Sequence, residues 1–175
     1  MKRKILRSDF FSNNAVKASK CLLGKYIVRK WREGEIALPI FEAEAYDGFK
    51  DLASHASSGK TARNIVMFGP PGFWYVYFTY GMHWMINIVT GESGYPSAVL
   101  IRGAGEIAGP ARLAKFLHVT GAQNKKFSCK RSGLWIEDRG LTVKNSKIKR
   151  LPRIGVDYAG EEWAKKPYRF LAELD

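Results

Sequence analysis

The chain has 175 residues, the size of one ordinary domain, and its 46% hydrophobic and 26% charged residues are typical of a soluble globular protein. No window approaches 18 apolar residues, and the basic start at residues 1–4 is followed by Ser8-Asp9, so we expect neither a membrane span nor a signal peptide. Lysine and arginine total 29 against 16 acidic residues, a net charge of +13 that attracts polyanions. Nucleic acid is favoured over a membrane surface, because no basic amphipathic helix is evident.

The first part of the chain predicts one helix and two strands. Asn14 can cap a helix that begins at Ala15 and stops at Gly24. Residues 26–32 and 38–46 are typical of strands, with a turn at Glu33-Gly34 between them. Residues 47–64 are polar and contain glycine and serine, which predicts a structured loop, and residues 69–72 predict a turn.

The second part predicts more strands and a short helix. Residues 73–89 are aromatic and β-branched, and Gly81 in their middle predicts the tip of a hairpin. Residues 97–102 form another apolar run, and Pro110 suits the first turn of a helix that ends near His118. Residues 121–150 are rich in lysine and glycine and predict loops and short strands. Strands with hairpins dominate, so the expected class is α+β, in one domain over residues 1–175.

The strand at residues 40–46 carries two carboxylates close together. Side chains alternate along a strand, so Phe41, Ala43 and Ala45 are expected to face the core. Glu42, Glu44 and Tyr46 then share the opposite face. From the pattern alone a solvated face is the favoured interpretation. The alternative is a carboxylate base beside an aromatic ring, where partial burial raises the pKa and the basicity.

The hairpin predicted at residues 73–89 is aromatic on both faces. Tyr75 and Tyr77 share one face, so one face is expected in the core and the other offers a stacking surface for bases. The tip carries the large side chains Tyr80, Met82 and His83, although exposed tips prefer small polar residues. Two interpretations stay open, a tip tucked against the body of the protein and a wedge that enters a base step.

Two polar residues end or interrupt apolar strands. Asn87 is disfavoured in its strand, and the simplest role for it is to satisfy a buried backbone group. Arg102 closes residues 97–102 and is either a surface arginine or a residue that binds phosphate and orients a water. The two cysteines and three histidines have no spacing typical of a metal site, so we expect no metal and no cofactor.

Taken together, these motifs resemble the alkyladenine (3-methyladenine) DNA glycosylase family. The resemblance lies in Glu42-Ala-Glu-Ala-Tyr46, His55, Gly59–Asn64, Met67-Phe68, Tyr75-Val-Tyr77, Tyr80-Gly-Met82, Asn87 and Val99–Arg102, and it extends to residues 153–160 and 166–170. It implies a single domain with a curved, partly barrel-like antiparallel sheet, flanking helices and a protruding β-hairpin that intercalates into DNA.

The resemblance also implies roles for individual residues. Glu44 matches the general base that deprotonates the attacking water, and Arg102 matches the arginine that holds this water and a nearby phosphate. Asn87 matches the residue thought to clash with the 2-amino group of ordinary guanine, and Ile154 would offer its backbone carbonyl to the water. The remaining implied substrate-binding residues are Tyr46, Ala53, His55, Tyr77 and Leu100, and the implied intercalating residues are Tyr80, Met82 and His83.

The implied activity is removal of damaged purines from duplex DNA by a monomer without a cofactor, at the nucleoid in the cytoplasm of a prokaryote or in the nucleus of a eukaryote. Purines of the 3-methyladenine, 7-methylguanine, hypoxanthine and ethenoadenine type would be flipped out and their N-glycosidic bonds hydrolysed, leaving an abasic site. Three alternatives stay open: a non-catalytic module that binds damaged DNA, an RNA-binding domain, and a lyase with a lysine nucleophile. Glu44 disfavours the first, because a pure DNA binder would gain from losing this carboxylate.

Overall fold

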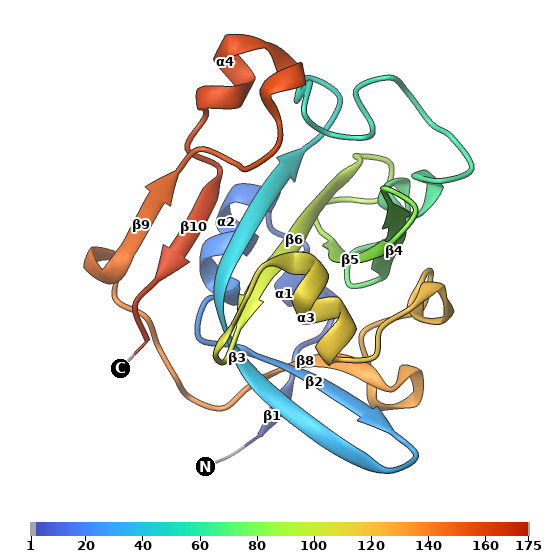
Figure 1. Cartoon of the computed structure of the whole chain (residues 1–175), viewed down its shortest axis with the longest axis vertical. Helices are drawn as coiled ribbons and strands as arrows, with labels where there is room; N and C mark the ends of the chain where they lie inside the picture. The colour runs from blue at the N-terminus through green and yellow to red at the C-terminus, as the bar shows by residue number, and fades with distance from the viewer. Residues whose placement is uncertain (1–2, 175) are drawn as a thin grey trace.

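The computed structural model describes residues 3–174 and arranges its strands in one curled antiparallel sheet (Figure 1). Neighbouring strands follow the order β1, β8, β2, β3, β6, β5, β4, while β10 joins β3 to β9 and β7 pairs with β6. The strand bounds are Lys4–Ile5 (β1), Tyr26–Trp31 (β2), Gly34–Asp47 (β3), Trp74–Thr79 (β4), His83–Val89 (β5), Ser97–Ala104 (β6), Ile107–Ala108 (β7), Leu134–Asp138 (β8), Ile148–Leu151 (β9) and Arg169–Ala172 (β10).

Short helices cover this sheet, which confirms the α+β class. Helix α2 packs against β3, and α3 packs against β5 and β6. No helix in the described range 3–174 is both long and apolar enough to cross a membrane. The α-helices are Ser8–Phe11 (α1), Ala15–Leu22 (α2), Pro110–Phe116 (α3) and Gly160–Lys165 (α4), and the 3-10 helices are Ile65–Phe68 (η1), Gly121–Gln123 (η2), Lys130–Ser132 (η3), Asn145–Lys147 (η4) and Asp157–Ala159 (η5).

Strand β3 is the longest strand of the described range and pairs with three other strands. Its first half pairs with β2 through the predicted turn, and its second half pairs with β6. At Glu42, Ala43 and Glu44 it also pairs with β10 on its other edge. The carboxylates at 42 and 44 are therefore flanked by strands on both sides, in the interior of the sheet. The prediction of a solvated face is therefore wrong. Because β10 lies far along the chain from β3, the residues around Glu42 and Glu44 do not reveal this burial.

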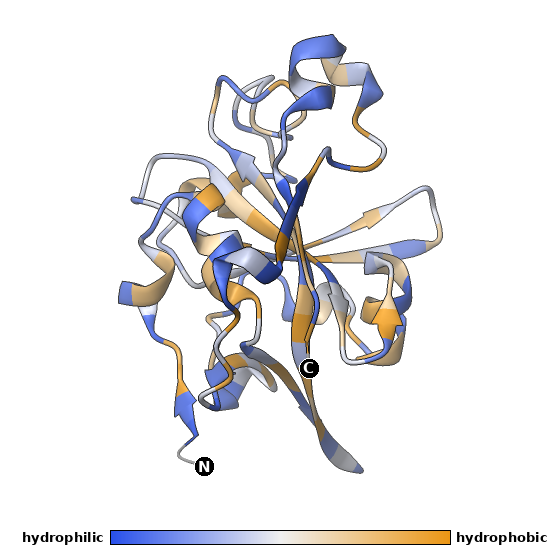
Figure 2. Cartoon of the chain, turned by 90° about the vertical axis from the view of Figure 1, so that its left-hand side faces the viewer, coloured by the Kyte–Doolittle hydropathy of each residue, from blue (hydrophilic) through white to orange (hydrophobic). Residues whose placement is uncertain are grey.

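The hydrophobic core lies against the sheet. Its largest fully buried side chains include Trp74, Phe11 and Leu22. Figure 2 shows hydrophobic residues along the strands, whereas hydrophilic residues prevail in α4 and the outer loops. Ala43 and Ala45 enter the core as predicted, but Phe41 does not. Phe41 lies at an irregularity in the β3–β6 register, where its half-buried ring lies close to Gly103.

Local signals along the chain were accurate. The Asn14 side chain caps α2 by accepting a hydrogen bond from the Lys17 N–H at 2.8 Å, and Gly24 follows the helix with a φ of +81°. The predicted hairpin is formed by β4 and β5. Helix α4 and strand β10 were not predicted.

Candidate active site

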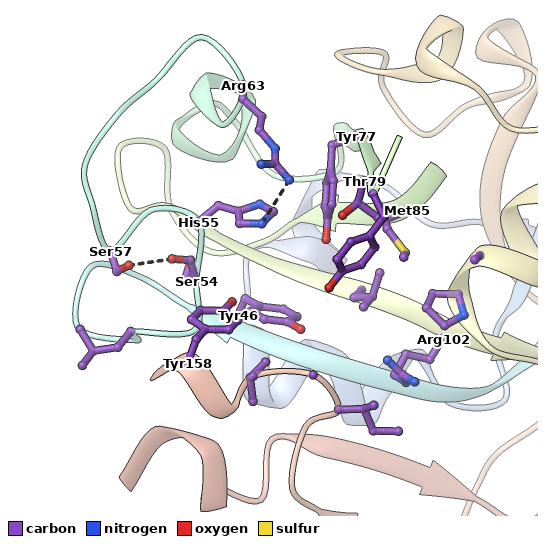
Figure 3. Close-up of a pocket in the computed structure, with 18 of the residues that line it drawn as sticks. Tyr46, Ser54, His55, Ser57, Arg63, Tyr77, Thr79, Met85, Arg102 and Tyr158 are labelled. Carbon is purple, nitrogen blue, oxygen red and sulfur yellow. Dashed lines mark hydrogen bonds between the residues drawn. The ribbon is translucent and has the colours of Figure 1, made fainter. Parts of the chain in front are cut away.

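A cavity of about 750 Å³ opens between the β4–β5 hairpin, the loop of residues 52–63 and the loop of residues 154–158. Figure 3 shows its lining side chains. A smaller cavity of about 20 Å³ shares Tyr46, His55 and Tyr77 with it. Of the predicted residues, the large cavity is lined by Tyr46, His55, Tyr77, Tyr80, Leu100, Arg102 and Ile154, and the small one by Tyr46, Ala53, His55, Tyr77 and Asn87.

Glu44 is fully buried behind this lining, with 0% of its surface exposed. Its Oε1 accepts a hydrogen bond from the backbone N–H of Ile154 at 2.9 Å and lies 3.3 Å from Nη1 of Arg102. Its Oε2 accepts a hydrogen bond from the Tyr46 hydroxyl at 2.9 Å. Burial raises the pKa of Glu44, and Arg102 and the Ile154 N–H partly oppose this rise. The result is a carboxylate more basic than an ordinary glutamate, in contact with three residues that line the cavity.

Arg102 belongs to a cluster of two carboxylates and two arginines. Its Nε lies 3.4 Å from Oε1 of Glu42, which also accepts a hydrogen bond from Nη1 of Arg169 at 3.0 Å. The Arg102 side chain is 11% exposed, so the interpretation as a surface arginine is wrong. Since Arg102 contacts Glu42 and Glu44 from neighbouring strand β6, its guanidinium is fixed at the cavity wall.

Tyrosines and a neutral histidine form the other wall. The rings of His55 and Tyr77 are 4.7 Å apart, and those of Tyr75 and Tyr77 are 5.1 Å apart. Burial, followed by the charge of Arg63, lowers the pKa of His55 to about 4, and burial raises the pKa of Tyr75 to about 12. Both side chains are therefore uncharged near neutral pH. Trp74 lies on the opposite face of β4 and is in the core, so this is the core face of the two that the alternation distinguished.

Arg63 is a lining residue to which the sequence assigned no role. Its guanidinium lies 4.8 Å from the ring centroid of Tyr77, and its Nη2 lies 3.4 Å from Nε2 of His55. An arginine can only donate, so Nε2 accepts and Nδ1 carries the proton that His55 shares with the Tyr75 hydroxyl at 2.8 Å. The sequence signal that could have pointed to Arg63 is the neighbouring Asn64 in this polar loop. Asn64 is buried, and its side-chain amide donates hydrogen bonds to the carbonyls of His55 and Gly59.

An ion pair that the sequence did not predict, between Asp51 and Arg153, connects two loops around the site. Arg153 contacts both carboxylate oxygens of Asp51, at 2.5 and 2.8 Å, and donates to the carbonyl of Ala45 at 2.9 Å. Both charged side chains are fully buried. The Arg153 guanidinium also lies 4.8 Å from the ring centroid of Tyr46. Arg153 therefore positions Tyr46 and, through the chain, the N–H of Ile154 that reaches Glu44.

Asn87 satisfies a buried backbone group, which is the simplest role that the sequence suggested for it. It is 3% exposed, and its amide donates to the backbone carbonyl of Tyr75 at 3.1 Å. Its strand neighbour across the sheet is Leu100 of β6. Both residues line the cavities, so the amide of Asn87 is held at the inner end of the site.

The hairpin tip is exposed, so the interpretation of a tucked tip is wrong. Tyr80 is 81% and Met82 66% exposed, and His83 is exposed as well. Tyr80 and Gly81 have φ angles of +52° and +65°, and the N–H of Met82 donates to the carbonyl of Thr79 at 3.1 Å. A positive φ costs a residue other than glycine about 1–2 kcal/mol. A strained, solvent-exposed tyrosine is unfavourable for the fold, so this position is a candidate contact with a partner.

The chain matches a family model described as methylpurine-DNA glycosylase, over residues 9–108 and 104–175. It is 44% identical over 186 residues to a protein of Methanocella arvoryzae, with 95% of this chain and 91% of that protein covered. It is 41% identical to a protein of Legionella pneumophila, covering 96% and 93%, and 40% identical to one of Streptomyces avermitilis, covering 99% and 90%. All three relatives carry the name "Putative 3-methyladenine DNA glycosylase". The chain belongs to the methylpurine-DNA glycosylase family.

Proposed function

We propose that the cavity receives a damaged purine flipped out of duplex DNA and hydrolyses its N-glycosidic bond, leaving an abasic site. The observation that carries the proposal is Glu44, a carboxylate without exposed surface that is held by Arg102 and the Ile154 N–H beside Tyr46. If this chain of net charge +13 only bound DNA phosphates, a carboxylate at this position would lower its affinity for DNA. The partner is duplex DNA, and the protein acts on it as a monomer.

Binding begins with extrusion of the base, which costs a few kcal/mol and costs least for a damaged or poorly paired base. The flipped purine stacks on the rings of Tyr46, Tyr77 and His55, and each aromatic contact contributes about 1–3 kcal/mol. A purine alkylated at N3 or N7 is positively charged and gains cation–π attraction from the tyrosines. The proposed substrates are the cationic purines 3-methyladenine and 7-methylguanine and the neutral purines hypoxanthine and ethenoadenine, all of which can stack on these rings.

Hydrolysis needs one water at the carboxylate. Oε2 of Glu44 accepts one hydrogen bond, from Tyr46, and a carboxylate oxygen has a second acceptor position, which must open to the cavity for a water to donate to it. The water oxygen bonds to C1′, the bond from C1′ to the purine nitrogen breaks with its electron pair going to the purine, and the water proton passes to Glu44. A cationic purine leaves as a neutral molecule. A neutral purine such as hypoxanthine leaves as a neutral molecule only when its N7 takes up a proton from solvent as the bond breaks, and Glu44 later returns the water proton to solvent. Arg102 orients the water and contacts a neighbouring phosphate, and the Ile154 carbonyl supplies a second acceptor for the water.

Selection against undamaged bases rests on the inner end of the cavity. Asn87 is fixed by its hydrogen bond to Tyr75, so its amide cannot turn away from the 2-amino group of an ordinary guanine. Ala53 and Leu100 limit the space on either side of the purine.

The experiment is single-turnover base release from duplex oligonucleotides that each carry one hypoxanthine, ethenoadenine or 7-methylguanine, or from duplexes methylated to contain 3-methyladenine. Free base should appear from damaged duplexes, and the strand should break only after alkali. Tight binding without release of any base would mean a DNA-binding module instead. Strand breakage without alkali would mean a lyase, in which a lysine amine attacks C1′.

We further propose that the tip of the β4–β5 hairpin enters the base stack that the flipped purine vacates. Tyr80 lines the cavity mouth and is the most exposed large hydrophobic residue of the described chain. Met82 and His83 follow it on the same exposed tip. An inserted ring replaces the lost base stacking and keeps the purine from returning.

Replacing Tyr80 with asparagine should remove the inserted ring without destabilising the hairpin. Asparagine followed by glycine suits a turn whose central residues both have positive φ, so thermal stability should be unchanged or higher. Loss of the ring should reduce single-turnover base release at sub-saturating protein about tenfold or more, as expected from a lost stacking contact. The matched control is Phe116→Ala on α3, which removes an exposed ring outside the cavity. Equal effects of both variants on release would contradict insertion by Tyr80.

A further inference from the structure

We propose that Arg63 is a specificity-determining residue, whose positive charge beside Tyr77 and His55 disfavours cationic purines in the cavity and favours neutral ones. This proposal rests on the proposed glycosylase function. It concerns which lesions are removed and not whether bases are removed.

The guanidinium lies directly against the base-stacking wall. It is 4.8 Å from the ring centroid of Tyr77 and 3.4 Å, from Nη2 to Nε2, from His55. In Figure 3 Arg63 lies on one side of His55 and Tyr77, while Tyr46 lies on their other side. A purine stacked between Tyr46 and the opposite rings therefore has Arg63 behind those rings.

The loop holds Arg63 in this place. Asn64 next to it is 1% exposed, and its amide donates to the carbonyls of His55 and Gly59 at 2.8 Å. Its side-chain oxygen accepts from the N–H of Thr61 at 2.7 Å. The backbone of Arg63 is thus tied to the same loop turn that carries His55, and its guanidinium reaches the wall through its contacts with His55 and Tyr77.

No carboxylate neutralises this charge within the described range. The ion pairs of residues 3–174 include Arg102, Arg153 and Arg169, but none includes Arg63. Its contacts are uncharged: the imidazole of His55, the ring of Tyr77 and the hydroxyl of Tyr75. A cation bound beyond that wall is repelled by Arg63.

The ring of Tyr77 already makes a cation–π contact with Arg63. A tyrosine face attracts positive charge through its quadrupole, and this attraction is what a methylated, cationic purine would gain on stacking. Arg63 takes this place at Tyr77, so a cationic purine gains less from this ring than from Tyr46. A neutral purine such as hypoxanthine stacks on both rings without repulsion.

The expected effect is moderate, because Arg63 is exposed to solvent. At a separation of roughly 8 Å and a dielectric constant between those of water and a protein surface, repulsion of two unit charges changes binding by about three- to tenfold. This is a change in preference between lesions, and not an absolute barrier to either.

The experiment compares 7-methylguanine, which is cationic, with hypoxanthine, which is neutral, at one position of the same duplex. Single-turnover base release is measured with protein in excess over the duplex but below saturation, for the unmodified protein, Arg63→Gln, Arg63→Lys and Lys60→Gln. Lys60 is the matched control, since it lies in the same loop over the ring of Phe68 and does not line either cavity. The pH is kept well above the His55 pKa of about 4, so that this ring stays neutral.

Arg63→Gln should raise the ratio of 7-methylguanine release to hypoxanthine release about three- to tenfold. Arg63→Lys should keep the original ratio, and Lys60→Gln should weaken both releases equally. A merely structural Arg63 would lower both releases by one factor in the glutamine variant and leave the ratio unchanged, which would overturn the proposal. Absence of release from both duplexes by the unmodified protein would overturn the proposed function itself.

Discussion

Replacing Glu44 with glutamine is expected to slow single-turnover base release by about a hundred- to ten-thousand-fold, the usual contribution of a general base. Glutamine has the shape of glutamate but cannot take the proton of the attacking water. Binding of the damaged duplex should stay within a few-fold, because Glu44 has no exposed surface that DNA could contact. Release of labelled base and electrophoretic binding to the same duplex measure the two quantities.

The control for Glu44→Gln is Glu35→Gln, a carboxylate on the same strand β3 but outside the cavity. This control should leave release unchanged. Arg102 keeps Glu42 as a partner in the glutamine variant, so thermal unfolding should show a folded protein. Near-normal release by a folded Glu44→Gln protein would contradict the role given to this carboxylate.

Replacing Arg153 with methionine is expected to lower the free energy of unfolding by about 3–5 kcal/mol. The variant leaves Asp51 as a fully buried charge without its bidentate partner, and it removes the bond to the Ala45 carbonyl. Denaturation with urea measures the loss. Arg150→Met on β9, an exposed position, is the control and should change stability by less than about 0.5 kcal/mol.

A double variant tests the cause of this loss. Asp51→Asn combined with Arg153→Met removes the unpaired charge, so it should recover part of the stability lost in Arg153→Met alone. A single variant that loses less than about 1 kcal/mol would contradict the importance of the buried pair.

The sequence predicted those parts of the fold that depend on neighbouring residues. The Asn14 cap and Gly24 bound α2, and Gly81 marks the tip of the β4–β5 hairpin. Alternation along β4 separates the core residue Trp74 from the cavity residue Tyr77. These features need only the periodicity of a strand or helix and the chemistry of a turn, which a short window of sequence contains.

The burial of the catalytic candidate could not be predicted in this way. Glu44 is buried because β10 pairs with β3 and because the N–H of Ile154 reaches it across 110 residues of chain. Likewise, Asp51 and Arg153 lie 102 residues apart, and each alone is an ordinary polar residue in a loop. Alternation placed Glu42 and Glu44 on one face, but whether that face meets water depends on distant segments.

The most direct test of the account is the pH dependence of 7-methylguanine release at saturating protein, with spontaneous loss from protein-free duplex subtracted. This purine leaves without an added proton, so the acidic side of the profile should report the base. The pKa of Glu44 is raised by burial, and only the ionised carboxylate accepts a proton. We predict release that rises with pH to a plateau, with a midpoint above the 4.5 of an ordinary glutamate, and a residual Glu44→Gln rate without this rise. A rise that persists in Glu44→Gln, or a rate that is flat down to pH values below 4.5, would contradict the assignment of Glu44 as the general base.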